Sequence, residues 1–224
     1  MKFKISKLYI AIAVTVILVV IFYVVKSQIE NHLLKKVIER LTADSRVAEV
    51  IVTDVKRDAK TKKTYTTIKF LEYDTKLNPL EPKYFTFSGN VIQFQSMVIR
   101  FDDFYVKKGH PLKGKSAYLF MMAFMLTDNG AETFEITKIN EIPSGYEAAD
   151  VKNDLEKKLW KKFWEYALNP EKAGKIGIKN AQIEAPGTKF IPGMIYTIKI
   201  EHDGGLRIDA KPVTPILKNE KIKF

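Results

Sequence analysis

The sequence predicts an α+β protein. A single N-terminal transmembrane helix continues into an amphipathic stalk helix, and a mainly antiparallel β-sheet domain follows with one long amphipathic helix packed on it. Three observations predict this class: an apolar run at residues 8–25, period-two patterns within residues 48–101 and 178–210, and a helical apolar stripe within residues 143–169. We therefore expect four parts, a tail (1–7), a span (8–25), a stalk (26–44) and a domain (45–224).

The apolar run has the length and composition of a membrane span. Its sequence, LYIAIAVTVILVVIFYVV, forms roughly 27 Å of helix, close to the ~30 Å hydrocarbon thickness of a bilayer. Lys7 and Lys26 flank it, and Tyr9, Phe22 and Tyr23 lie near its ends, where aromatic rings favour the headgroup layer. The run is longer than the apolar part of a signal peptide and no small-residue cleavage site follows, so we expect a retained signal anchor.

The basic residues around the span predict its orientation. Lys2, Lys4 and Lys7 favour a cytoplasmic tail, and a long domain is translocated largely regardless of its own charge. We therefore expect the inner (cytoplasmic) membrane, with the N-terminus inside and the C-terminal domain extracytoplasmic. The chain also lacks any Asn-x-Ser/Thr glycosylation acceptor, which favours a bacterial envelope protein.

Composition restricts the chemistry and the partners. The chain has 37 basic against 26 acidic residues, a net charge of +11, and no cysteine. The missing thiols exclude a disulfide framework, a thiolate metal site and a cysteine nucleophile. The positive charge favours anionic partners, such as lipid headgroups or anionic surface polymers, and an extracytoplasmic location disfavours nucleic acid.

Past the span, residues 27–44 keep a helical pattern. Apolar residues recur there at spacings of three and four, at Ile29, Leu33, Leu34, Val37, Ile38 and Leu41. No breaker separates this stalk from the span, so the two can form one continuous helix. The stripe either docks onto the chain's own sheet or forms a dimerising coiled coil, which would allow self-association or binding of other envelope proteins through the stalk.

The first half of the domain reads as strands and hairpins. Residues 48–56 and 64–73 are rich in β-branched and aromatic residues and flank a polar hairpin loop at 57–63. Residues 84–87 and 91–101 flank the turn-forming Ser88, Gly89 and Asn90, which predicts a second hairpin. Residues 117–126, AYLFMMAFML, predict a buried strand or core helix, with a partner interface as the alternative, and residues 133–139 predict a short strand.

A phosphate-loop pattern lies between these strands. The segment GHPLKGKS matches G-x-x-x-x-G-K-[ST], and its candidate phosphate- or anion-binding residues are Gly109, His110, Lys113, Gly114, Lys115 and Ser116. Pro111 removes one amide donor, and the preceding strands alternate as hairpins rather than forming βαβ units. We therefore expect no nucleotide cofactor, and a solvated charged turn or an anion-binding turn is favoured instead.

A long helix is predicted at residues 143–169. Ser144 and Glu147 have capping-box spacing, and Asn169-Pro170 ends the pattern. One face holds both tryptophans of the chain and the other is rich in lysine. We expect the apolar face to pack on the sheet; the alternative is a basic helix lying on an anionic membrane.

The C-terminal part predicts more sheet and no metal site. Residues 178–184 read as a strand, residues 194–201 and 206–210 as a hairpin, and residues 212–224 as a basic tail. His202 and Asp203 supply only two ligands on a turn, which makes a poor metal site.

The motifs favour binding over catalysis. The chain contains neither G-x-S-x-G nor H-E-x-x-H, so no catalytic residue is predicted. The leading hypothesis is a membrane-anchored binding or scaffold module in a membrane-associated assembly. The rival is a nucleotide-binding hydrolase that uses residues 109–116 if the domain is cytoplasmic.

Overall fold

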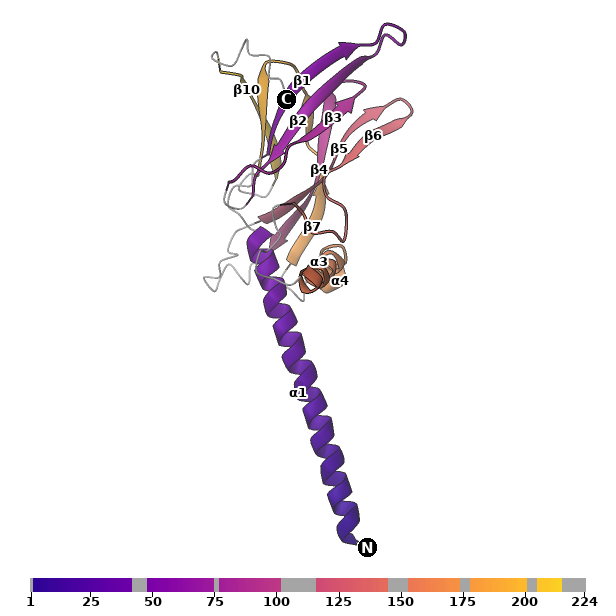
Figure 1. The fold of residues 1–224 in the computed structure, drawn as a ribbon, viewed down its shortest axis with the longest axis vertical. Helices are drawn as coiled ribbons and strands as arrows, with labels where there is room; N and C mark the ends of the chain where they lie inside the picture. Colours follow the sequence, from indigo (N-terminus) through magenta and orange to yellow (C-terminus); the bar gives the residue numbers. More distant parts are fainter. Residues whose placement is uncertain are drawn as a thin grey trace.

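The computed structural model describes residues 2–41, 48–74, 77–101, 116–144, 153–173, 178–200 and 205–214. It shows a long N-terminal helix and a domain with two antiparallel sheets, one of which carries a helix on its outer face (Figure 1). The predicted α+β class with a mostly antiparallel sheet domain is therefore confirmed.

Helix α1 (Lys2–Leu41) runs without a break through the apolar segment and beyond it. It projects from the domain as a rod whose N-terminal end lies far from the sheets (Figure 1). Its C-terminal part contacts helix α3 (Asn153–Ala167) and strand β5 (Ser116–Thr127). Most side chains of α1 after Ile29 lie outside the described part of the structure, so the amphipathic character of the stalk stays a prediction.

The first sheet has the strand order β10-β9-β1-β2-β3. Its strands are β1 (Ala48–Arg57), β2 (Thr64–Glu72), β3 (Lys83–Phe87), β9 (Met194–Ile200) and β10 (Leu206–Pro212). The predicted β1–β2 hairpin forms, and Asp58 organises its loop because its carboxylate accepts the amides of Lys60 and Thr61 at 2.7 and 2.8 Å. These bonds lower the pKa of the Asp58 carboxyl. Strands β9 and β10 also pair as predicted.

The second sheet has the order β6-β5-β4-β7, with β8 (Gly187–Lys189) paired to β4. Its other strands are β4 (Val91–Phe101), β5, β6 (Gly130–Glu135) and β7 (Ile178–Glu184). Residues 117–126 therefore form a strand rather than a helix. Strand β6 ends at Glu135, short of the predicted residue 139, because the amides of Ile136 and Thr137 leave the ladder and both donate to the Met121 carbonyl.

The predicted hairpin of residues 84–87 with 91–101 is wrong. Strand β3 pairs with β2, whereas β4 pairs with β5, β7 and β8, so the turn at residues 88–90 carries the chain from one sheet to the other. A Cβ at Gly89 would lie 2.8 Å from the Met125 sulfur, so glycine permits this close crossing. A turn-forming composition specifies a change of direction, but it does not specify which strand pairs next.

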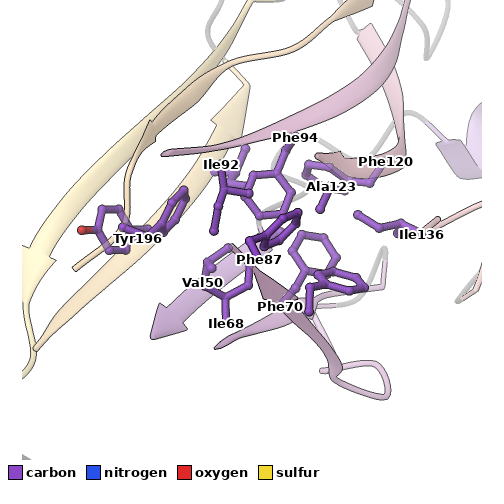
Figure 2. Close-up of a cluster of buried hydrophobic side chains, with 14 of the residues drawn as sticks. Val50, Ile68, Phe70, Phe87, Ile92, Phe94, Phe120, Ala123, Ile136 and Tyr196 are labelled. Atoms are coloured by element: carbon purple, nitrogen blue, oxygen red, sulfur yellow. The ribbon is translucent and has the colours of Figure 1, made fainter. Parts of the chain in front are cut away.

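The two sheets pack face to face over an aromatic core. Rings of Phe70, Phe94 and Phe120 meet there, with centroids 5.4 Å apart for Phe70–Phe94 and 5.2 Å for Phe70–Phe120 (Figure 2). Tyr196 lies at one end of the same core, where its hydroxyl donates to the Lys189 carbonyl at 3.0 Å and accepts the Ile191 amide at 2.8 Å. We call this cluster the inter-sheet core.

A second core fills the space between the second sheet and α3. Trp160, Phe163 and Trp164 of the helix are buried against Met97, Ile99, Leu119 and Met121 of β4 and β5. The part of β4 and β5 beneath α3 is thus covered on both faces, which explains why Leu119, Phe120 and Met121 are apolar in succession instead of alternating. A bulge at Met121, which is the additional residue between the pairs Gln95–Met122 and Ser96–Phe120, lets β5 supply residues to both cores.

The helix region differs in detail from its prediction. The described helix α3 begins at Asn153; Ser144 lies in a turn, and Glu147, its predicted capping partner, lies outside the described residues. Pro170 does break the helix, but a short helix α4 (Pro170–Ala173) starts there at once. Asn169 caps it, since its side-chain oxygen accepts the amides of Glu171 and Lys172 at 3.1 and 3.2 Å.

Candidate functional site

The most unusual surface of the molecule is the apolar part of α1. The segment Tyr9–Ile29 has a mean hydropathy of 2.6, and none of it is buried by the rest of the chain. It is long and apolar enough to cross a membrane, and among the described residues no other helix is. An exposed apolar surface of this size marks a region that lipid or another protein covers. By length and composition, the segment fits a membrane anchor or a signal sequence.

Polar groups within this segment are compatible with a lipid environment. Thr15 is the one Ser or Thr between Tyr9 and Tyr23. Its hydroxyl donates a hydrogen bond to the Ala11 carbonyl at 2.9 Å, so this donor is paired within the helix. In the hydrocarbon layer, every such group has to be satisfied within the protein. Phe22 and Tyr23 pack edge to face near the other end, with centroids 5.8 Å apart.

Helix α3 carries exposed lysines outside the face that buries its tryptophans. Lys157, Lys158 and Lys161 are exposed, and none of them forms an ion pair within the described part of the chain. Glu165, on the same helix, pairs instead with Lys172 of α4. That pairing lowers the pKa of Glu165 and raises the pKa of Lys172, because the hydrogen bond between them and then the attraction of their charges favour the ionised forms. We call Lys157, Lys158 and Lys161 the α3 lysine face.

A second exposed surface lies on the outer side of the second sheet, beyond the area that α3 covers. Val91 and Leu126 are 55% and 66% exposed, and Met122 and Phe124 beside them are half-buried. Their chain neighbours Ile92, Ala123 and Met125 point into the inter-sheet core, so these four side chains point outward. We call Val91, Met122, Phe124 and Leu126 the outer-face patch.

Two polar clusters form hydrogen bonds between different segments of the sheet domain. Glu184 of β7 accepts Arg100 Nη2 at 3.3 Å and the Leu206 amide at 3.0 Å, so it connects the edges of the two sheets. The Tyr73 hydroxyl donates to Glu49 at 2.7 Å, and partial burial and the carboxylate together raise its pKa to about 12. In the first cluster the buried Nε of Arg100 has no hydrogen-bond partner within the described residues.

The described residues offer no metal centre. No group of three or more histidine, aspartate or glutamate side chains is close enough together in this part of the chain to hold an ion. His202 and Asp203, the pair weighed from the sequence, lie outside the described residues.

The predicted anion-loop residues lie almost entirely outside the described part of the structure. Gly109, His110, Lys113, Gly114 and Lys115 belong to residues 102–115, which are not described, so the shape of this loop is untested. Ser116 is described and is the first residue of β5. In a phosphate loop the corresponding hydroxyl residue begins a helix. Here Ser116 begins a strand instead.

The sequence indicated the outer-face patch only through the alternative weighed for residues 117–126, a partner interface, and it did not indicate Val91. Val91 and Leu126 occur within apolar strand patterns, and only the position of α3 shows which outward residues stay uncovered. The missing signal is the boundary of the helix footprint, which depends on how β4, β5 and β7 align.

Fold and surfaces together define a two-sheet domain joined to a long apolar helix. Comparison with protein families, curated proteins and solved structures finds no match to this chain.

Proposed function

We propose that this protein is a single-pass membrane protein whose extracytoplasmic domain acts as a binding or scaffold module in a membrane-associated assembly. The observation that carries the proposal is the apolar segment Tyr9–Ile29, which the rest of the chain leaves wholly uncovered. An α-helix pairs its backbone amides and carbonyls within itself, so it can lie in the hydrocarbon of a membrane. The rest of α1 joins this segment directly to the domain.

The outer-face patch supports the binding role. It is an apolar area on the outer face of the second sheet that α3 leaves uncovered, so a partner protein has direct access to it. Half-buried methionine and aromatic side chains adapt well to a partner surface. We therefore place the partner site at Val91, Met122, Phe124 and Leu126.

Topology is tested with single-cysteine variants, because the natural chain has no cysteine. Ala59→Cys lies in the exposed β1–β2 loop, and Ser6→Cys lies before the span. With a membrane-impermeant maleimide and intact cells, we expect labelling of Ala59→Cys, and labelling of Ser6→Cys only after permeabilisation. The reverse pattern would refute the orientation, and release of the protein by alkaline carbonate would refute the anchor.

Partner binding is tested by site-specific photocrosslinking in cells. A photoreactive residue at Leu126 is expected to give a discrete crosslinked species, and the same residue at Val55, an exposed position on β1 of the first sheet, provides the control. Leu126→Glu should abolish crosslinking from Val91. A protein that stays monomeric in detergent and yields no crosslink from either patch position would contradict the scaffold role.

A further inference from the structure

The position of α3 relative to the apolar helix carries a further inference. Helices α3 and α4 lie at the end of the domain nearest the apolar part of α1 (Figure 1), and α1 contacts α3. Since Tyr9–Ile29 is not buried, this contact falls on the remainder of α1, which ends at Leu41. That remainder is roughly 18 Å long, so α3 lies within that height of the end of the span.

The charge on this end of the domain is complementary to an anionic membrane. The α3 lysine face is exposed; Glu165 on the same helix is hydrogen-bonded to Lys172, and its single negative charge, which Lys161 also attracts, leaves the lysines in excess. Headgroups add about 5–8 Å to each side of the hydrocarbon layer, and the field of an anionic leaflet extends a further Debye length of about 8–10 Å. The headgroup depth and the Debye length together come to about 13–18 Å, which matches the roughly 18 Å between the end of the span and the end of α1.

We propose that the α3 lysine face binds the anionic headgroups of the membrane that α1 spans. This inference rests on the proposed membrane-anchored function. The contact is electrostatic and peripheral, because Trp160, Phe163 and Trp164 are committed to the core under the sheet and do not reach lipid. Its consequence is a domain held against the bilayer at two points, the stalk and α3.

The test uses the full chain in vesicles. A nitroxide label at Leu168→Cys, an exposed position directly after α3, reports on the distance of α3 from the bilayer through relaxation by a nickel-chelating lipid. The protein is reconstituted in phosphatidylcholine alone and in phosphatidylcholine mixed with phosphatidylglycerol. We expect several-fold stronger relaxation in the mixed vesicles, and loss of this difference in the triple variant Lys157→Gln, Lys158→Gln, Lys161→Gln.

The matched control removes the same charge elsewhere. Lys60, Lys62 and Lys63 are exposed in the β1–β2 loop, at the opposite end of the domain from α1 (Figure 1). Their triple replacement by Gln should leave the lipid dependence intact. Tryptophan emission, which reports only Trp160 and Trp164, confirms that each variant is folded.

Each alternative result has a defined meaning. Equal relaxation in both lipids, or a lysine-face variant that behaves like the natural chain, overturns the lipid contact while the anchor stands. If that variant keeps its lipid dependence but loses a crosslinked protein in cells, the lysine face binds an acidic protein and the lipid proposal is overturned. Failure of the natural chain to float with either vesicle overturns the anchor itself, and the lipid contact with it.

Discussion

Ser96 is a buried polar residue whose hydroxyl lies on the inter-sheet side of β4, between Phe94 and Val98. It is fully buried, and its Oγ has no hydrogen-bond partner within the described part of the structure. Leaving such a group unpaired costs about 1–3 kcal/mol of desolvation. We expect Ser96→Ala to raise the free energy of unfolding by about 1 kcal/mol, measured by urea denaturation of the full chain in detergent.

A satisfied hydroxyl provides the comparison for Ser96. Thr127 donates to the Gly130 carbonyl at 3.0 Å in the β5–β6 turn, so Thr127→Ala should lower stability where Ser96→Ala raises it. A loss of stability in Ser96→Ala would show that its hydroxyl has a partner in the folded protein.

Tyr73 illustrates the opposite case, a polar group that is paired. Its pKa rises from 10.0 to about 12 because partial burial and the adjacent Glu49 both favour the neutral phenol. The folded-state pKa is the higher one, so this contribution to stability is complete below pH 10 and is lost as the pH rises towards 12. We expect Tyr73→Phe to remove this part of the pH dependence, measured as the free energy of unfolding across that range.

Two variants separate the causes of the Tyr73 shift. Glu49→Gln removes the charge and keeps an acceptor, so absorbance titration near the tyrosinate band should show a smaller rise in the Tyr73 pKa, since burial remains. Tyr65→Phe, in strand β2, which ends at the residue before Tyr73, is the matched control and should leave the pH dependence in place. A Glu49→Gln chain that titrates like the natural one would exclude the carboxylate as a cause.

At the scale of elements, local sequence patterns predicted most strands, but they did not predict which strands pair with each other. Strands β1, β2, β4, β7, β9 and β10 follow from period-two alternation or β-branched composition, since each is read within its own residues. The pairing of β3 and β4 does not, because whether a chain turns back or crosses to a second sheet depends on a core assembled from distant strands. Strand β8 and helix α4 are too short to carry a periodic signal.

Strand β8 supplies an element-scale prediction through Gly187. A Cβ there would lie 2.4 Å from Gln93 Cγ and 3.1 Å from the Ile92 carbonyl oxygen, so a side chain would push β8 away from β4. We expect Gly187→Ala to destabilise the domain by about 1–3 kcal/mol. Thermal unfolding followed by tryptophan emission measures the loss.

A second glycine distinguishes crowding from backbone strain. Gly193 has a φ of +79°, and a Cβ there would meet no atom within 4 Å, so only its backbone conformation restricts it. Gly193→Asn should be tolerated, because asparagine adopts this conformation more readily than other residues. If Gly187→Ala is equally benign, β8 is not held as closely to β4 as its geometry requires.

At the scale of the whole molecule, the anchor and the domain are physically separate. The domain's two cores involve residues of the sheets, α3 and α4, and the segment Tyr9–Ile29 contributes to neither. This separation was predictable from the sequence. An uncharged apolar run is stable in lipid, whereas strands that alternate apolar and polar residues have one face in a core and the other in water. The sequence indicated the candidate binding surfaces only as alternatives, and it could not show which of their residues stay uncovered, since that depends on where α3 lies on the sheet.

The separation predicts that the anchor is disrupted without loss of the fold. Arginine near the centre of a span costs about 2.5–3.5 kcal/mol per residue, so Val16→Arg with Val20→Arg should prevent stable insertion. We expect this variant to leave the carbonate-resistant membrane fraction, whereas Val16→Leu with Val20→Leu stays in it. In detergent the arginine variant should keep the natural tryptophan emission, because Trp160 and Trp164 are buried beneath the sheet, away from the span. An arginine variant that remains in the membrane would exclude this segment as the anchor, and one whose tryptophans become exposed would show that α1 is required for folding of the domain.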